Sequence, residues 1–285
     1  MRSGVIMVMT EKIRKIWLLG LALVIVGLCG SNAFALDFLG PPVAELDRNV
    51  FSAGIEYSLS SIDLDLVDGD LIVYQNGVFL GSGAAPSVTV KDVEVNTLYA
   101  TFGYGIVENY EVFLRMGLAS AEFGDSLWEE GEDFDSNVDF AIGAGFKATF
   151  YEAFDWKVGG IFQVNMTELD GKLESSAWSV YQPNFVEIGS TEMQIAIGVN
   201  YLRSSWLSIY GGPFVHFISG DFDYKFTRVG ENFDTGEYSW EFNEGPTYGG
   251  YIGAQIKVIE NGFANVEYQQ TSDADFIGAS FLLKY

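Results

Sequence analysis

The sequence predicts a single all-β domain, a transmembrane up-and-down antiparallel β-barrel of about ten strands, with eight or twelve strands as the alternatives. Three observations favour this fold class. Apolar residues recur at every second position in about ten segments, short and long connections alternate between these segments, and no apolar run beyond residue 35 reaches the about 20 residues that a membrane-spanning helix needs. Because lipid offers backbone polar groups no hydrogen-bond partner, strands can span it only as a closed barrel.

The N-terminal segment has the three parts of a secretory signal. Basic residues lie within 12–15, an apolar run covers 16–28, and a small-x-small cleavage site ends at Ala35. The apolar run is too short for a spanning helix. We therefore expect residues 1–35 to be a cleaved signal peptide and residues 36–285 to form one barrel domain.

Composition and charge exclude several classes of function. Acidic residues outnumber basic ones by 39 to 15, for a net charge of −24, whereas a nucleic-acid partner requires a basic surface. The only cysteine, Cys29, lies in the predicted signal peptide, so the remaining chain has no disulfide, thiolate metal site or thiol nucleophile. Cys29 also follows Leu28 rather than a small residue, which argues against a lipoprotein anchor.

Alternation with a period of two residues locates the strands. In the clearest strand, 138–150, Phe140 and Ile142 share one face, whereas Asp139 and Lys147 share the other. A helix would mix these residues on one face. The same alternation predicts nine further strands, at 51–59, 98–106, 112–118, 156–166, 193–201, 207–217, 248–258, 264–268 and 277–285.

The connections alternate in length. Short turns are expected near 107–109, 152–155, 204–205 and 260–262, and long loops at 60–91, 122–137, 168–190, 219–246 and 270–275. Short turns on one side and long loops on the other are typical of bacterial transmembrane barrels, whose loops lie outside the cell. An Asn-Gly pair predicts a hairpin over 72–80, outside the membrane, and 224–242 is expected to extend its neighbouring strands. Val93 and Val95 break the alternation, which a bulge or an emergence from the membrane would explain.

Glycines recur on the predicted inner face. Ile-Gly pairs at 142–143, 197–198 and 252–253 are spaced by 55 residues, and Gly103 and Gly278 occupy corresponding places. A barrel of few strands has a crowded lumen, and a glycine leaves room for side chains from the opposite wall. The repeat therefore supports the assignment of the inner face.

The C-terminal residues resemble the C-terminal signal of outer-membrane β-barrel proteins, a terminal aromatic preceded by apolar residues at alternate positions. The matching residues are Ile277, Ala279, Phe281, Leu283 and Tyr285. The resemblance implies an outer-membrane protein that is inserted by the barrel-assembly machinery and contacts outer-membrane lipid and lipopolysaccharide. It implies no activity, since one architecture hosts many functions. A soluble periplasmic all-β protein is the alternative, but its outward apolar faces would form an oversized exposed patch.

Charged residues on the predicted inner faces form the candidate site. About ten strands enclose little more space than their side chains fill, so inward charges must pair or reach water. The strand assignment turns eight such residues inward: Glu56, Arg115, Asp139, Lys147, Lys157, His216, Lys257 and Glu267. They predict either an ion-pair network that plugs the lumen or a narrow ion pathway.

No catalytic residue is predicted. His216 is the only histidine, and Phe214 stands two residues before it, where the outer-membrane proteases called omptins have an aspartate. The outer-membrane lipid A deacylases use a histidine and a serine oriented by a carboxylate, and no sequence neighbour of His216 indicates that arrangement. His216 is therefore expected to be a hydrogen-bonded lumen residue.

No metal ligand or cofactor is predicted either. Asp133, Asp135, Asn137 and Asp139 resemble a calcium-binding loop, but Val138 stands where that loop needs its glycine. The acidic loops are expected to be solvated, or to bind divalent cations loosely at the lipopolysaccharide surface.

These residues predict a non-enzymatic outer-membrane barrel with a charge-plugged lumen and a structural or surface-interacting role. A narrow channel for small solutes or ions is the second interpretation, and an outer-membrane hydrolase is the third. Closure of the lumen separates the first interpretation from the second, and a cluster of histidine, serine and carboxylate in space would indicate the third.

Overall fold

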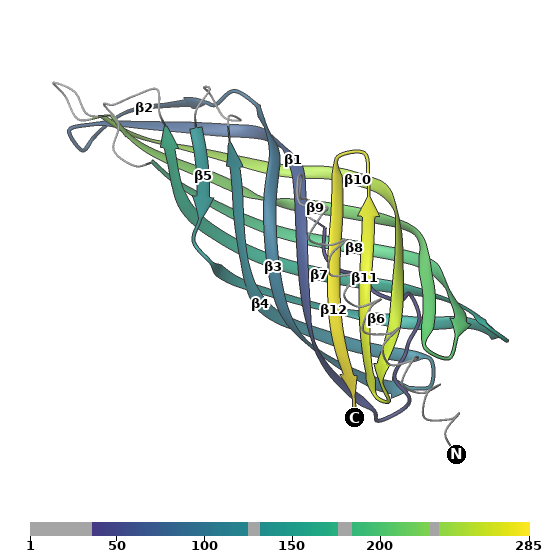
Figure 1. The fold of residues 1–285 in the computed structure, drawn as a ribbon. Coiled ribbons are helices and arrows are strands. Elements are labelled where there is room, and N and C mark those ends of the chain that lie inside the picture. The colour runs from purple at the N-terminus through teal and green to yellow at the C-terminus, as the bar shows by residue number, and fades with distance from the viewer. Residues whose placement is uncertain (1–35, 125–131, 176–183, 229–233) are drawn as a thin grey trace, which may run out of the picture.

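The computed structural model describes residues 36–124, 132–175, 184–228 and 234–285, which form one twelve-stranded antiparallel sheet (Figure 1). The predicted signal peptide lies outside these residues. No helix in the described part of the chain is long and apolar enough to cross a membrane. The strands are β1 (Phe51–Gln75), β2 (Val78–Ala84), β3 (Val88–Val107), β4 (Tyr110–Gly124), β5 (Glu132–Ser136), β6 (Asp139–Ala153), β7 (Trp156–Ser175), β8 (Asn184–Ser204), β9 (Leu207–Arg228), β10 (Asp234–Ile259), β11 (Gly262–Gln270) and β12 (Ala274–Lys284).

The sheet closes on itself. β12 pairs with β1 from Ser52↔Lys284 to Ile62↔Ala274, and every other neighbour around the ring is antiparallel. β5 and β6 both lie between β4 and β7, while β2 pairs only with β1 among the described strands. The twelve strands therefore occupy ten positions around the barrel, in agreement with the predicted fold class and strand number.

One end of the barrel carries short turns. The turns after β3, β6, β8 and β10 cover residues 108–109, 154–155, 205–206 and 260–261, close to the predicted positions. At the other end Asn76 and Gly77 have φ values of 52° and 76°, which suit the two-residue hairpin turn that the sequence predicts there. Because short turns of such barrels face the periplasm, the hairpin end is the extracellular end.

The predicted long loops at 60–91, 168–190 and 219–246 were wrong in part, because paired strands continue through most of their residues. The inner and outer faces of the sheet exchange polarity at the membrane boundary. Near the turns, β1 directs Ile55 outward with 60% exposure and Glu56 inward. Further along the strand, Leu64 points inward with 3% exposure and Asp65 is exposed. Alternation with outward apolar residues therefore predicts each strand only as far as the membrane boundary.

The same exchange of polarity explains the break in alternation before residue 98. Val93 is 2% exposed because it packs inside the barrel beyond the membrane boundary. Asp92 has a φ of 52°, and the β1–β3 register shifts between Ile62 and Leu64, so a bulge is present as well. Both explanations offered by the sequence thus apply.

Beyond the membrane boundary, packed apolar side chains fill the interior of the barrel. We call the parts of β1, β3, β4 and β7–β10 in this region, with β2 and β5, the extracellular extension. Tyr238 stacks on Trp240 with ring centroids 5.0 Å apart, and Phe123 stacks on Phe134 at 4.6 Å. Other members of this core are Leu66, Val90, Leu173, Val186, Phe222 and Phe242, each at most 1% exposed. The extension is therefore a packed β-structure.

Within the membrane-spanning part, an apolar belt covers the outer surface. Exposed residues of this belt come from strands around the whole ring: Ile55, Leu98, Phe102, Leu114, Phe140, Ile142, Ile195, Ile197, Ile209 and Ile252. A closed antiparallel barrel with such a belt is the architecture of outer-membrane β-barrels.

The glycines on the inner face leave room for aromatic side chains. A Cβ at Gly253 would fall on the ring of Tyr210, and one at Gly278 would fall on the ring of Phe276. Tyr210 and Phe276 are 2% and 1% exposed, so neither ring has free space to move into. The repeated glycines therefore leave room for side chains as predicted, but these rings come from the adjacent strand β9 and from β12 itself and not from the opposite wall.

We expect Gly253→Ala to lower the free energy of unfolding by about 1–3 kcal/mol, because the added methyl group overpacks the lumen against Tyr210. Gly250→Ala on the same strand is the matched control, since the nearest atom to its added Cβ lies 4.0 Å away. Urea titration of the micelle-folded protein, followed by tryptophan fluorescence, measures both. Equal losses in the two variants would contradict the close packing at Gly253.

Candidate functional site in the barrel lumen

Residues 36–43, which we call the plug segment, lie inside the barrel before the chain enters β1. Leu36, Phe38, Leu39 and Val43 are at most 4% exposed. The plug segment is outside every strand, so it forms no part of the wall. The sequence predicts these residues to be part of the barrel domain and indicates no separate role for them.

The wall binds the main chain of the plug segment. The carboxylate of Glu267 accepts hydrogen bonds from the backbone N–H groups of Leu39 (2.9 Å) and Gly40 (2.8 Å). Gln269 donates from Nε2 to the carbonyl oxygen of Asp37 at 2.8 Å, and Arg115 donates to the carbonyl oxygen of Phe38. These contacts satisfy backbone groups that an unpaired buried segment would otherwise leave without partners.

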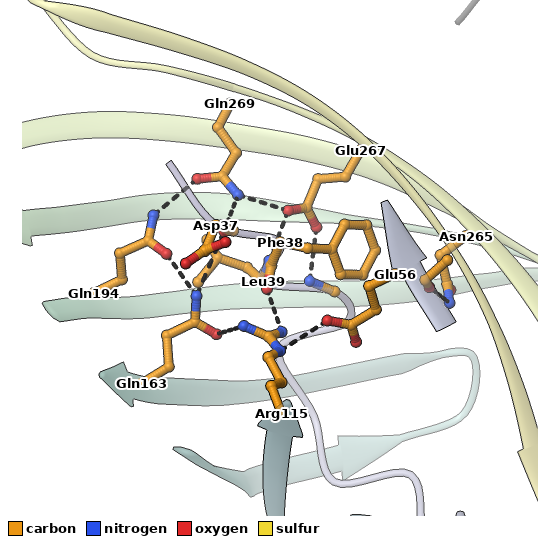
Figure 2. Close-up of polar contacts among 12 residues, drawn as sticks. Asp37, Phe38, Leu39, Glu56, Arg115, Gln163, Gln194, Asn265, Glu267 and Gln269 are labelled. Atoms are coloured by element: carbon orange, nitrogen blue, oxygen red, sulfur yellow. Dashed lines mark hydrogen bonds and ion pairs between the residues drawn. The ribbon is translucent and has the colours of Figure 1, made fainter. Parts of the chain in front are cut away.

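The binding side chains are joined into one chain of polar contacts around the lumen (Figure 2). Arg115 donates to Gln163 at 3.0 Å, and Gln163 donates to Gln194 at 2.6 Å. Gln194 donates to Gln269 at 3.1 Å, and Gln269 in turn donates to Glu267 at 2.8 Å. The five residues come from β4, β7, β8 and β11, so strands on different sides of the barrel are tied to the same plug segment.

An ion pair fixes the charged end of this chain. Arg115 Nε lies 2.7 Å from Glu56 Oε2, and the two side chains are 2% and 10% exposed. The Arg115 guanidinium also lies over the ring of Phe113, 4.8 Å from its centroid. Because the guanidinium is surrounded by protein, its charge depends on Glu56 for compensation.

Three of the eight predicted lumen residues, Glu56, Arg115 and Glu267, meet at the plug segment. His216 also lies inside, 2% exposed, with Nε2 3.6 Å from Glu192 Oε2. Nε2 has no hydrogen-bond partner in the described part of the chain, so the expected hydrogen bond is not made at this nitrogen. Glu192 was not among the predicted residues.

Lys147 also reaches the plug segment, because its Nζ lies 3.0 Å from where a Cβ on Gly40 would stand and 5.7 Å from the ring centroid of Phe113. The other three predicted residues lie elsewhere. Lys157 pairs with Glu152 at 2.9 Å on the periplasmic surface, and Lys257 lies near the periplasmic end of β10. Asp139 lies at the extracellular end of β6, where it accepts a hydrogen bond from the backbone of Asp170 at 3.0 Å. The alternation of the strands predicts which face each of these residues occupies. It does not predict how far along the barrel axis each residue lies.

Sequence reasoning missed the three glutamines that complete the site. All three, Gln163, Gln194 and Gln269, are 0% exposed. Their inward direction follows from the alternation of the strands, but only charged inward residues were taken as candidates. Three inward amides on neighbouring or facing strands were the available signal, because each amide can both donate and accept a hydrogen bond.

The cavities that the described residues leave next to the plug segment are small. Above the plug segment, a cavity of about 30 Å³ is lined by residues that include Leu36, Leu64, Glu192 and Phe242. Two larger hollows lie at the surface. One, of about 670 Å³, is at the periplasmic mouth beside Glu45. The other, of about 740 Å³, is lined by both outward and inward residues of β6–β9.

The residues that resemble a C-terminal assembly signal lie on β12 and just after it. Ile277, Phe281 and Leu283 pair with Leu59, Ile55 and Ala53 of β1. They therefore stand at the seam where the barrel closes. Their reading by an assembly machinery stays a prediction.

No protein-family model matches the chain, and no curated protein matches its sequence. Solved structures with a similar fold are outer-membrane barrels. The outer membrane protein OprG from Pseudomonas aeruginosa is 13% identical with a TM-score of 0.41, over 84% of this chain and 97% of that one. The translocator domain of the autotransporter NalP from Neisseria meningitidis is 12% identical with a TM-score of 0.42, over 85% and 89%. The Ralstonia pickettii toluene transporter TbuX is 10% identical with a TM-score of 0.40, over 90% and 94%.

Proposed function

We propose that this chain is a non-conducting, non-enzymatic outer-membrane barrel whose role is to hold a rigid acidic β-structure at the cell surface. The observation that carries the proposal is closure of the interior at two successive levels. The plug segment fills the membrane-spanning part, where Leu39 is 0% exposed. The apolar core of the extracellular extension fills the part above it, where Phe222 is 0% exposed.

The surface chemistry supports a role in contact with the outside. Outward carboxylates follow the apolar belt on successive strands, among them Asp65, Asp170, Glu187 and Asp221. Lys225 donates a hydrogen bond to Glu187 at 3.0 Å, and this bond raises the pKa of the lysine. Lipopolysaccharide, reached through divalent cations, is the membrane partner that such carboxylates fit.

Planar-bilayer recording tests the proposal. A folded barrel is recognised by an unheated sample that migrates differently on gels from a heated one. Such protein is expected to give no discrete conductance steps. Reproducible steps from the intact chain would contradict it. Vesicle-swelling measurements with small sugars supply the corresponding test for uncharged solutes.

A gated channel is the second candidate function, and one observation favours it. The plug segment is held by side chains of the wall and not by strand pairing, so it could leave without opening the barrel. Deleting residues 36–43 separates the two functions. A gated channel should then conduct, whereas a barrel closed at two levels should stay silent because its extracellular core remains packed.

The hydrolase reading is not favoured. The polar neighbour that the structure places beside His216 is the carboxylate of Glu192, and Nε2 reaches no hydroxyl within hydrogen-bond distance in the described residues. A serine nucleophile would need that contact.

A further inference from the structure

Among the described residues, β2 is a strand with one unpaired edge, and it lies at the extracellular end of the molecule. Figure 1 shows β2 beside the end of β1, at the opposite end of the barrel from the C-terminus. Its residues pair with β1 from Asp70↔Ala84 to Gln75↔Val78, and the same part of β1 pairs on its other side with β10. The same residues of β10 also pair with β9, so within the described residues β2 is the edge strand of a sheet, ordered β2-β1-β10-β9, that projects from the barrel.

The backbone groups that face away from β1 can be assigned. Ala85 N–H donates to the carbonyl oxygen of Gly69 at 2.6 Å, so these two residues form a hydrogen-bonded pair. Hydrogen-bonded and non-hydrogen-bonded pairs alternate along an antiparallel ladder. Ala84 and Ser82, one and three residues before Ala85, consequently direct their N–H and C=O groups to the open edge.

The open edge carries no charge. Residues 78–84 contain neither a charged side chain nor a proline, which are two of the devices that blunt an exposed edge. Val78, Phe79 and Leu80 are 67%, 58% and 64% exposed. The β1–β2 register shifts between Val73 and Tyr74, so Leu80 has no directly opposite residue on β1. An extended peptide could therefore pair with the strand and cover its apolar side chains.

The charge around the edge selects the partner. Asp68 and Asp70 are exposed on β1, and Asp70 stands directly opposite Ala84. The whole chain carries a net charge of −24, so a second copy would approach against repulsion between like charges. A segment with basic residues would instead gain from these carboxylates.

We propose that the open edge of β2 is a docking site for an extended, basic segment of a partner polypeptide, which adds to the sheet as a further strand. The inference rests on the proposed surface role and names the kind of partner. The main-chain groups of Ser82 and Ala84 would hold the incoming strand. Val78, Phe79 and Leu80 would contact its apolar side chains, and Asp68 and Asp70 would contact its lysines or arginines.

The probe is a synthetic peptide of alternating valine and threonine with lysines at both ends, added to the full folded chain in detergent micelles. Fluorescence anisotropy of the labelled peptide is expected to show saturable binding, and amide exchange at Ser82 and Ala84 is expected to slow. Ser82→Pro removes an outward N–H that β1 does not use, and edge strands accept proline at such positions. It should weaken binding at least about tenfold, whereas Ser82→Val, which keeps the N–H, should not.

A second variant keeps the test independent of the folding of Ser82→Pro. Asp70→Asn leaves the backbone unchanged and should weaken binding of the lysine peptide, but not of a version that ends in threonine. Equal binding by Ser82→Pro and the wild type, or equal binding of a peptide that ends in glutamates, would overturn the proposal. So would a concentration-dependent dimer that Ser82→Pro abolishes, because the edge would then belong to a second copy. Conductance by the intact chain would overturn the proposed function and leave this result standing.

Discussion

Arg115→Ala is expected to lower the free energy of unfolding by about 3–5 kcal/mol, because it leaves the buried carboxylate of Glu56 without its cation. The substitution also removes the donors to Gln163 and to the carbonyl oxygen of Phe38, so one end of the polar chain around the plug segment is lost. Unfolding in urea, followed by the mobility of unheated samples on gels, measures the loss.

Two comparisons identify the cause. Adding Glu56→Gln to Arg115→Ala should restore part of the stability, since the uncompensated charge is then gone. Lys157→Ala removes an ion pair of nearly the same length, 2.9 Å, but its side chains are 41% and 52% exposed, so it should cost less than about 1 kcal/mol. If Arg115→Ala proved as mild as Lys157→Ala, the buried ion pair could not be what anchors the plug segment.

Trp240→Ala is expected to destabilise the extracellular extension by about 3–5 kcal/mol while the membrane-spanning barrel stays closed. Trp240 is 1% exposed and packs between Tyr238 and Phe222, with ring centroids 5.0 and 6.0 Å away. Its indole N–H donates to the carbonyl oxygen of Pro86 at 3.0 Å, which ties β10 to the segment between β2 and β3. Truncation therefore leaves a cavity and frees this segment.

Limited proteolysis of the micelle-folded protein locates the effect. New cleavage in β9, β10 or the β1–β2 hairpin is expected, together with faster amide exchange there, while the lower parts of the strands keep their protection. Trp156→Ala is the control at the opposite end, where the indole is 51% exposed and stacks on Tyr201 at 4.3 Å. Loss of protection along the whole barrel would mean that the extension and the membrane-spanning part unfold as one unit.

Local residue patterns determined the barrel and its orientation. A strand has a side-chain period of two, so Phe140 and Ile142 alone show which face meets lipid, and the position of short turns shows which end faces the periplasm. The recurrence of glycines on the inner face could be predicted for the same reason, but the rings that they accommodate, Tyr210 and Phe276, could not. These features depend on neighbours in the chain or on facing strands.

The height of each residue along the barrel axis, and the course of the plug segment, were decided only by the tertiary structure. Period-two alternation turns Arg115, Lys157 and Lys257 inward alike, but only Arg115 lies level with Phe38. The plug segment has no periodicity because it forms neither a strand nor a helix, and its partners Glu267 and Gln269 lie more than 220 residues away in the sequence. The continuation of the strands beyond the membrane was not predicted from the sequence, for a related reason. Outside lipid the solvent reverses the preference of each face, so Leu64 turns inward on the same strand whose Ile55 turns outward.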